Sequence, residues 1–530
     1  MQISDRELKK GKTQVPAYRA MYLDSQLKGG DLIKVEKDNA FRALIRNMQT
    51  MEEHKFQIPR EQEKILRGYQ KEGFYWIKTL KHNQFGGILA DDMGLGKTLQ
   101  VLTFLWSEFQ ESAPGENRRV LVITPASLVF NWMNEIERFA PGLPATVVTG
   151  DLKERKALIK NAGEREVLIT SYDLLKRDLK AYRNLDFAVQ IIDEAQYIKN
   201  HGTQVAKAVK EIRSEFRLAL TGTPVENRLS ELWSIFDFLM PGFLYSYEKF
   251  RKEIELPAVQ YSNSDAMERL QKMIRPFVLR RLKRDVLKDL PDKLEKDMFS
   301  PLESEQKELY EAHTERLRLM LGMQSDAEFR TSKLQILAEI TRLRQICCYP
   351  GLVYEGYKGN SSKLEMCMEL VQNAVNGGHK LLLFSQFTTM LDVLAARLKK
   401  AKVSFYMLTG ATSKEKRAQM VQAFNEDDTS VFCISLKAGG TGLNLTAADI
   451  VIHYDPWWNL AVQNQATDRA HRIGQQNVVS VYRLFMKDTI EERIRALQER
   501  KRELADEILS GEGIGQALIS REEVLELLGR

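Results

Sequence analysis

Two series of short apolar runs, separated by a polar stretch with helical periodicity, constrain the fold of this chain most strongly. Within each series, runs rich in Val, Ile and Leu alternate with helical patterns. Strands buried on both faces of a parallel sheet have this composition, and intervening helices serve as crossovers. The sequence therefore predicts an α/β fold with two parallel-sheet lobes. The candidate strands are GGILA, RVLVITP, EVLIT, AVQIIDE and FRLALTG in the first series, and HKLLLFSQF, VSFYMLTG, SVFCISL, DIVIHYD and VVSVYRLF in the second.

A chain of 530 residues is too long for one hydrophobic core, so we expect several domains. The last segment has apolar residues near helical spacing and predicts a long amphipathic helix that packs back on the lobes; these residues are Ile490, Ile494, Leu497, Leu504 and Ile508. We expect an N-terminal extension or the tail of an upstream domain at 1–60, a first lobe at 61–290, a helical insertion at 291–360, a second lobe at 361–488 and C-terminal bracing helices at 489–530.

Composition excludes several classes of protein. Four cysteines without a C-x-x-C pair indicate reduced thiols, an intracellular location and no zinc site. Apolar runs are too short for a membrane span, and the N-terminus has no signal-peptide pattern. The formal net charge of +6 is compatible with a polyanionic partner.

The stretch GGILADDMGLGKTLQVL predicts a strand, a glycine-broken turn and a helix. Gly94 and Gly96 let the backbone approach an anion, and the helix N-terminus attracts phosphate. Lys97 would reach the outer phosphates and the Thr98 hydroxyl would bind Mg²⁺. The full phosphate-loop pattern has glycine where this chain has Asp91, so an ordinary strand-to-helix turn is the alternative.

The strand AVQIIDE delivers two acids at its carboxyl end. Asp193 would hold Mg²⁺ and Glu194 would polarise an attacking water. A solvated acidic turn is the alternative, and the phosphate loop upstream favours nucleotide hydrolysis. The following LTGTP is either simple turn chemistry or a sensor of the nucleotide site. In the second series, Arg469 and Arg472 are three residues apart. This spacing predicts that they share one helix face, where they would stabilise a transition state or form a surface ion pair.

Eleven motifs occur in the order of the SWI/SNF-type branch of superfamily-two helicase-like ATPases, and the chain resembles these DNA translocases from about residue 65 to 509. The motifs are LRGYQKEGFYWI, DDMGLGKT, LVITPASLVFNWMNE, ITSYD, DEAQ, LTGTP, RPFVLRR, LLFSQF, AGGTGLNL, DPWWN and QATDRAHRIGQ. The chain departs from the usual pattern with Gln196 where the family has histidine, and with Asp92 where it has glutamate.

The resemblance implies two RecA-like lobes with ATP and Mg²⁺ in the cleft and double-stranded DNA across both lobes. Gln70 would contact adenine, Lys97, Thr98, Asp193 and Glu194 would form the catalytic site, and Arg469 and Arg472 would complete it. A motor that tracks any sequence should bind phosphates. The expected DNA contacts are Thr124, Ser127, Ser171, Gln386, Gly440, Thr441 and Trp458.

Two features keep two interpretations each. The basic run Arg280, Arg281, Lys283 and Arg284 is either a DNA contact or a structural bridge, and for Trp457 core packing is favoured over DNA contact. We expect a DNA-associated ATPase that translocates on duplex DNA and remodels protein–DNA complexes. The alternatives are a strand-separating helicase, which would need a wedge, and a nucleotide-gated module that acts on a DNA-bound protein complex such as RNA polymerase.

Overall fold

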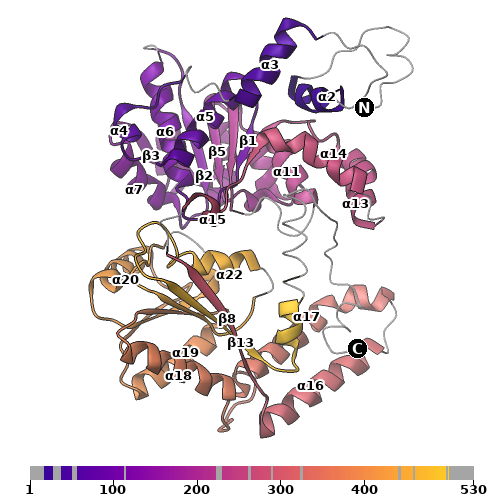
Figure 1. The fold of residues 1–530 in the computed structure, drawn as a ribbon, viewed down its shortest axis with the longest axis vertical. Helices are drawn as coiled ribbons and strands as arrows, with labels where there is room; N and C mark the ends of the chain where they lie inside the picture. Colours follow the sequence, from indigo (N-terminus) through magenta and orange to yellow (C-terminus); the bar gives the residue numbers. More distant parts are fainter. Residues whose placement is uncertain are drawn as a thin grey trace. The chain divides into compact units, whose positions relative to one another are not determined.

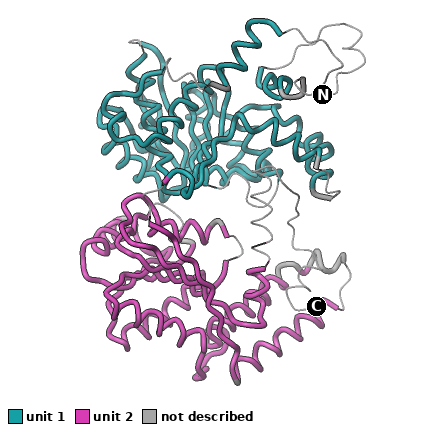
Figure 2. The backbone as a smooth tube through the Cα atoms, in the orientation of Figure 1, with its two compact units in different colours: residues 1–286, 504–516 teal, residues 287–503, 517–530 magenta. Residues whose placement is uncertain are grey.

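The computed structural model places two compact α/β units along the chain (Figures 1 and 2). The first comprises residues 1–286 with 504–516, and the second residues 287–503 with 517–530. In the part of the chain that the structure describes, no helix is both long and apolar enough to cross a membrane. The described residues are 17–27, 37–50, 56–112, 115–222, 229–260, 264–287, 291–322, 326–439, 443–457, 460–496 and 499.

The first unit is built on a parallel sheet with strand order β3-β4-β2-β5-β6-β1-β7. All five strands predicted for the first series are present, and β2, β4 and most of β5 are fully buried. The two outermost strands, β3 and β7, were not predicted. The strands are β1 (Gly87–Leu89), β2 (Val120–Thr124), β3 (Ala145–Val147), β4 (Val167–Ser171), β5 (Phe187–Asp193), β6 (Ser214–Leu220) and β7 (Val278–Leu279).

Helices connect these strands as crossovers, which confirms the predicted α/β alternation. The crossovers are α6 (Lys97–Glu111), α7 (Val129–Phe139), α8 (Leu152–Lys160), α9 (Tyr172–Tyr182), α10 (Gln204–Lys210) and α11 (Leu229–Leu239), the last followed by α12 (Tyr247–Phe250), α13 (Leu256–Gln260) and α14 (Ser264–Ile274). Helix α5 (Gly68–His82) precedes β1, and α15 (Lys283–Val286) follows β7.

The N-terminal segment contributes short helices to the first unit. The Tyr18 ring makes an edge contact with Phe243, with ring centroids 5.3 Å apart. The segment therefore packs on the insertion that follows β6. Its helices are α2 (Ala20–Leu27), α3 (Asn39–Thr50) and α4 (Arg60–Glu63).

The second unit has a parallel sheet with strand order β10-β11-β9-β12-β13-β8. All five strands predicted for the second series are present. The strands are β8 (Lys293–Ser300), β9 (Leu381–Ser385), β10 (Phe405–Leu408), β11 (Val431–Ser435), β12 (Ile450–His453) and β13 (Val479–Met486).

Strand β8 corrects the expectation that residues 291–360 are a helical insertion. It pairs with β13 over eight residues, from Lys293–Val479 to Ser300–Met486, and so belongs to the second sheet. Strand β8 was not predicted because its sequence KLEKD is charged, and a strand at the edge of a sheet tolerates charges that a central strand excludes. The compact units divide between Val286 and Leu287, four residues before the expected end of the first lobe at residue 290.

The rest of that segment contains two long helices, and further helices flank the strands of the second sheet. They are α16 (Ser304–Gly322), α17 (Asp326–Cys348), α18 (Ser362–Asn376), α19 (Thr388–Lys400), α20 (Lys414–Glu426), α21 (Leu436–Gly439) and α22 (Leu460–Thr467). A helix also covers 490–496, where Ile490 and Ile494 are buried. The remaining apolar positions of the expected C-terminal helix, Leu497, Leu504 and Ile508, lie outside the described residues.

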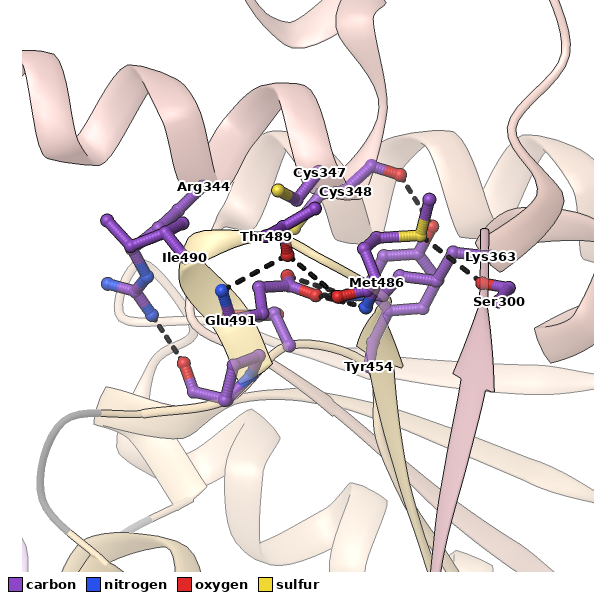
Figure 3. Close-up of polar contacts among 12 residues, drawn as sticks. Ser300, Arg344, Cys347, Cys348, Lys363, Tyr454, Met486, Thr489, Ile490 and Glu491 are labelled. Carbon is purple, nitrogen blue, oxygen red and sulfur yellow. Dashed lines mark hydrogen bonds and ion pairs between the residues drawn. The ribbon is translucent and has the colours of Figure 1, made fainter. Parts of the chain in front are cut away.

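A buried ion pair fixes the start of that helix (Figure 3). The ammonium of Lys363 in α18 donates to both carboxylate oxygens of Glu491 at 2.7 and 2.6 Å, and both side chains are completely buried. Glu491 also accepts from the backbone N–H of Met486 at 2.9 Å. The Lys363 ammonium also lies 5.4 Å from the centroid of the Tyr454 ring, whose hydroxyl donates to the carbonyl of Cys348 at 2.8 Å. One polar cluster thus joins α17, α18, β12 and the residues that follow β13.

Candidate active site

The turn between β1 and α6 has the geometry of a phosphate loop. Gly94 and Gly96 have φ of 86° and 76°, a backbone region that glycine enters without steric cost. Gly96 is the N-cap of α6, so the loop ends where the helix dipole begins. A Cβ at position 96 would also lie 2.5 Å from Nε2 of Gln70, so the glycine makes room for that side chain.

Gln70 lies in the first turn of α5, against the loop. Its Nε2 donates to the carbonyl of Leu95 at 3.0 Å, and its Oε1 accepts from the backbone N–H of Arg67 at 2.9 Å. The side chain is 3% exposed. The structure therefore brings Gln70 to the phosphate loop, where the sequence analysis expected an adenine contact.

Lys97, the first residue of α6, folds over the same loop. Its ammonium donates to the backbone carbonyl of Asp91 at 2.6 Å. Burial raises the pKa of Asp193, and the positive charge of Lys97 opposes that shift. The loop and the acidic motif, which are far apart in sequence, thus converge at the carboxyl edge of the sheet.

Asp193 ends β5 and is held by neighbouring donors. Its Oδ2 accepts from Nε1 of Trp132 at 2.9 Å and from the Thr124 hydroxyl at 3.2 Å. Its Oδ1 accepts from the backbone N–H of Glu194 at 2.9 Å. Burial raises the pKa of Asp193, while the hydrogen bond from Trp132 and the charge of Lys97 oppose that shift. The carboxylate is therefore oriented before any ligand arrives.

Thr124 and Trp132 both contact Asp193, which was not predicted from the sequence. We expected Thr124 to contact DNA, but it is fully buried and its hydroxyl donates to Asp193, so the structure assigns it to the acid site. A role for Trp132 was not predicted, because a tryptophan in an amphipathic helix usually packs in the core. Its motif, LVFNWMNE, was the available signal.

Glu194 has a left-handed backbone, with φ of 52° and ψ of 59°. A residue other than glycine rarely adopts this conformation, and such strain concentrates at functional sites. Its carboxylate accepts from Nε2 of Gln196 at 2.7 Å. Oε1 of Gln196 in turn accepts from the hydroxyl of Thr221, the residue after β6, at 3.1 Å. Gln196 therefore connects the acidic motif to the beginning of LTGTP, whose Thr223 and Pro224 lie outside the described residues.

Two stacked tyrosines lie beside the acid pair. The Tyr172 hydroxyl donates to the backbone carbonyl of Asp193 at 2.7 Å, and burial raises its pKa well above the usual value. The ring of Tyr197 stacks on that of Tyr172 with centroids 5.0 Å apart and is itself half exposed. The backbone at Asp193 is thus braced from the start of α9.

The residues expected to bind DNA are only partly described. Ser127 is exposed, while Ser171 is buried and caps α9 by accepting from the backbone N–H of Leu174 at 3.3 Å. The backbone N–H of Gln386 donates to the carboxylate of Asp455 at 3.3 Å. The expected contacts Gly440, Thr441 and Trp458 lie outside the described residues.

Arg469 and Arg472 belong to the second unit, and the prediction that they share a helix face is wrong. Helix α22 ends at Thr467. The backbone N–H groups of Arg469 and Ala470 then donate three residues back, to Ala466 at 3.2 Å and Thr467 at 3.1 Å. Such bonds tighten the chain into a turn instead of continuing an α-helix. Arg469 is buried, and Nη1 of Arg472 donates to the carbonyl of Leu443 at 3.3 Å.

The donors at the loop suit a magnesium nucleotide. Mg²⁺ prefers oxygen ligands and usually binds one or two carboxylates together with substrate phosphates. The Thr98 hydroxyl in the first turn of α6 and the pre-oriented Asp193 carboxylate are such donors. Among the described residues, no group of three or more His, Cys, Asp or Glu side chains forms a cage for a metal ion. The oxygen donors Thr98 and Asp193 are thus the residues of this site that would fit Mg²⁺.

Three family models match the chain. A model described as the SNF2-related domain matches residues 69–352, and the helicase conserved C-terminal domain matches residues 362–474. A model described as bacterial SNF2 helicase associated matches residues 1–59.

The chain is also similar to curated proteins and to a solved structure. An uncharacterised ATP-dependent helicase of Mycoplasma pneumoniae is 40% identical over 91% of this chain and 46% of its own length. A putative ATP-dependent helicase/translocase of Bacillus subtilis is 39% identical over 91% of this chain and 53% of its own length. The chain thus spans about half the length of these relatives. The solved SWI2/SNF2 ATPase core of Sulfolobus solfataricus in complex with dsDNA is 38% identical over 84% of this chain and 93% of that chain, with a TM-score of 0.42.

Proposed function

Because this chain belongs to the SNF2-related family of ATP-dependent helicases, we propose that it hydrolyses ATP and thereby translocates along double-stranded DNA without separating the strands. The observation that carries the proposal is the convergence of the phosphate loop and the acidic motif in the first unit. Strands β1 and β5 both pair in parallel with β6, so the loop after β1 and the acids at the end of β5 lie at one edge of the sheet, and Gln70 donates to the same loop.

In the proposed site each residue has a separate role. Lys97 binds the outer phosphates, Gln70 contacts the adenine, and Thr98 and Asp193 would hold Mg²⁺. When bound, Mg²⁺ neutralises negative charge on the phosphates. Glu194 accepts a hydrogen bond from the attacking water and orients it toward the terminal phosphorus. Its carboxylate is well placed to keep one orientation, since Gln196 donates to it at 2.7 Å.

The second unit supplies the other half of the proposed mechanism. Arg469 and Arg472 would stabilise the negative charge that develops in the transition state, as arginine fingers do. A composite site of this kind makes hydrolysis depend on both units. Binding to DNA can then control turnover by changing how often the site is complete.

The proposed polar DNA contacts bind phosphates and therefore carry no sequence information, whereas the indole of Trp458 would lodge against the tracked strand. We retain Ser127, Ser171, Gln386, Gly440, Thr441 and Trp458 as candidates, and we withdraw Thr124 because its hydroxyl is committed to Asp193. A motor that moves on duplex DNA displaces proteins bound ahead of it. We therefore extend the proposal to the remodelling of DNA-bound protein complexes inside the cell.

The first test is the ATPase rate without nucleic acid and with single-stranded DNA, duplex DNA or RNA. We expect duplex DNA to stimulate turnover most. Translocation is then measured by displacement of a third strand from a DNA triplex, with Glu194→Gln as the inactive control. The proposal fails if the protein efficiently unwinds a forked duplex, or if triplex displacement proceeds without ATP.

A further inference from the structure

The guanidinium of Arg281 contacts the phosphate loop at Asp91. Its Nε donates to Oδ1 of Asp91 at 2.9 Å and its Nη2 to Oδ2 of Asp91 at 2.6 Å. Nη2 also donates to Oε1 of Gln100 at 2.7 Å, and Nη1 donates to the backbone carbonyl of Tyr69. The Asp91 side chain is completely buried and that of Arg281 is 10% exposed. Two-pronged arginine–carboxylate contacts are among the strongest charge-assisted hydrogen bonds.

The surroundings are shaped for this side chain. The Arg281 guanidinium lies 5.2 Å from the centroid of the Tyr69 ring, whose hydroxyl donates to the carbonyl of Leu95 at 3.0 Å. A Cβ at Gly73 would lie 2.9 Å from Nη2 of Arg281 and would collide with the amide of Gln100. Helices α5 and α6 therefore converge on the ion pair. Of the two interpretations of the basic run, a DNA contact or a structural bridge, the structural one fits Arg281.

Backbone hydrogen bonds also join the phosphate loop to the segment that contains Arg281. The N–H of Ala90 donates to the carbonyl of Leu279 at 2.7 Å, and the N–H of Asp92 donates to the carbonyl of Arg281 at 3.0 Å. The carboxylate of Asp92 accepts from the N–H of Lys283 at 3.0 Å. The segment 279–283 thus runs alongside residues 90–92 of the loop. Three residues after Lys283 the first unit ends at Val286, and the chain continues into the second unit.

We propose that Arg281 is a positioning residue that makes the phosphate loop and the segment 278–287 respond together when nucleotide binds. The inference rests on the proposed function, because it takes the loop to be the ATP site. Its physical basis is that the buried Asp91 charge cannot move away from its partner without a large desolvation cost. A shift of the loop on binding phosphates therefore displaces the segment through Arg281 and the paired backbone. Nucleotide occupancy then reaches the connection between the two units through these contacts.

Hydrogen–deuterium exchange on the whole chain tests this inference, with a non-hydrolysable ATP analogue and Mg²⁺ as the probe. In the unmodified protein we expect the analogue to slow exchange in peptides covering both 88–98 and 278–287. In Arg281→Gln we expect the response of 278–287 to be lost while 88–98 still responds. The matched control is Arg284→Ala in the same basic run, because this guanidinium is 81% exposed and its ion pair is with the adjacent Asp285. It should preserve both responses.

The peptides of β2 and β5 report whether a variant is folded. If Arg281→Gln exchanges there as an unfolded protein, Asp91→Asn replaces it, since this change removes the charge of the pair and keeps the side-chain shape. An unmodified protein in which 88–98 responds and 278–287 does not would overturn the inference, and so would a full response of 278–287 in the folded variant. Absence of any response at 88–98 would instead contradict the proposed ATP site.

Discussion

The carboxylate of Glu194 and the hydroxyl of Thr221 are bridged by a single side-chain amide, that of Gln196. The two hydrogen bonds measure 2.7 and 3.1 Å and run in one direction, from Thr221 to Gln196 and from Gln196 to Glu194. A glutamine can donate and accept at once without titrating. The link between the acidic motif and the end of β6 should therefore persist across the physiological pH range.

Replacing the bridge should slow hydrolysis more than it weakens ATP binding. In Gln196→Leu both hydrogen bonds are lost, and the loss of a bond to a charged group costs about 1.5–3 kcal/mol. If this is lost only in the transition state, kcat falls by roughly 10- to 100-fold at similar KM. Steady-state kinetics with DNA would measure it, and Gln204→Leu, at an exposed position of α10, is the matched control. An unchanged kcat would show that Gln196 does not orient Glu194.

Substitution of Glu194 should affect ATP hydrolysis, whereas substitution of Lys97 should affect ATP binding. Glu194→Gln should bind a fluorescent ATP analogue normally yet hydrolyse ATP very slowly, because the attacking water loses the carboxylate that orients it. Lys97→Ala should weaken analogue binding, because the phosphates lose a positive charge. Lys207→Ala, on the exposed side of α10, should change neither. Wild-type turnover by Glu194→Gln would assign the general base elsewhere.

The arginines of the second unit should act only in catalysis. An arginine finger contributes about 10³-fold or more to turnover. Arg472→Ala should therefore abolish DNA-stimulated hydrolysis while the affinity for ATP stays within about twofold, since the ground state does not need the finger. Arg397→Ala in α19, a half-exposed arginine of the same unit, should retain activity. Loss of ATP binding in Arg472→Ala would point to a ground-state contact instead.

The Lys363–Glu491 pair should be costly to break and less costly to replace. Removing one partner of a buried pair leaves an uncompensated charge, which lowers the free energy of unfolding by about 3–5 kcal/mol. We expect Glu491→Gln to lower the stability of the second unit by about this amount, read from hydrogen exchange of β9 and β11. The double variant Lys363→Met with Glu491→Leu should be more stable than Glu491→Gln. Glu492→Gln, at the adjacent partly exposed position, is the control.

The buried His453 should make the second unit less stable as the pH falls. Burial lowers its pKa to about 3, and the charges of Arg483 and Lys293 add to this, against Glu295. The unfolded pKa is about 6.5, so below it the unfolded chain binds a proton that the folded chain excludes. The second unit should thus lose up to about 1.4 kcal/mol per pH unit between pH 6.5 and 5. His453→Gln should flatten this slope, whereas His82→Gln in the first unit should not. Equal slopes in all three proteins would contradict the assignment.

The strands with the clearest sequence pattern are those that are buried along their whole length. Strands β2, β4, β9 and β11 are buried along their whole length, so they are continuous apolar runs. The edge strand β8 leaves no such pattern, since solvent on one side permits charges, whereas the edge strand β10 is apolar and was predicted. Strand β7 has only two residues and is too short for any periodicity.

The site was predictable where a local pattern carries the chemistry and not where long-range pairing decides. The glycines, Lys97 and the acid pair follow directly from motifs. The role of Arg281 depends on Asp91, which is 190 residues away, so a basic run alone left both interpretations open. The spacing of Arg469 and Arg472 predicted a shared helix face, but the chain had already left the helix at Thr467. The roles of Thr124 and Trp132 depend on their distance from Asp193, which the sequence does not contain.

The pairing of β8 with β13 sets an order for folding during synthesis. In the described sheet β8 is the first strand to leave the ribosome and β13 is the last, and each is the other's neighbour. All described strands of the first sheet have emerged once β7 is made, so that sheet can form early, as domains usually fold in order of synthesis. Strand β8 must then wait, with its backbone unpaired, for the rest of its sheet. Its charged residues suit this delay, because a charged edge resists pairing with other chains. We expect any chaperone dependence of the nascent chain to be concentrated while residues 301–478 are being made, because β8 has no partner strand until β13 follows.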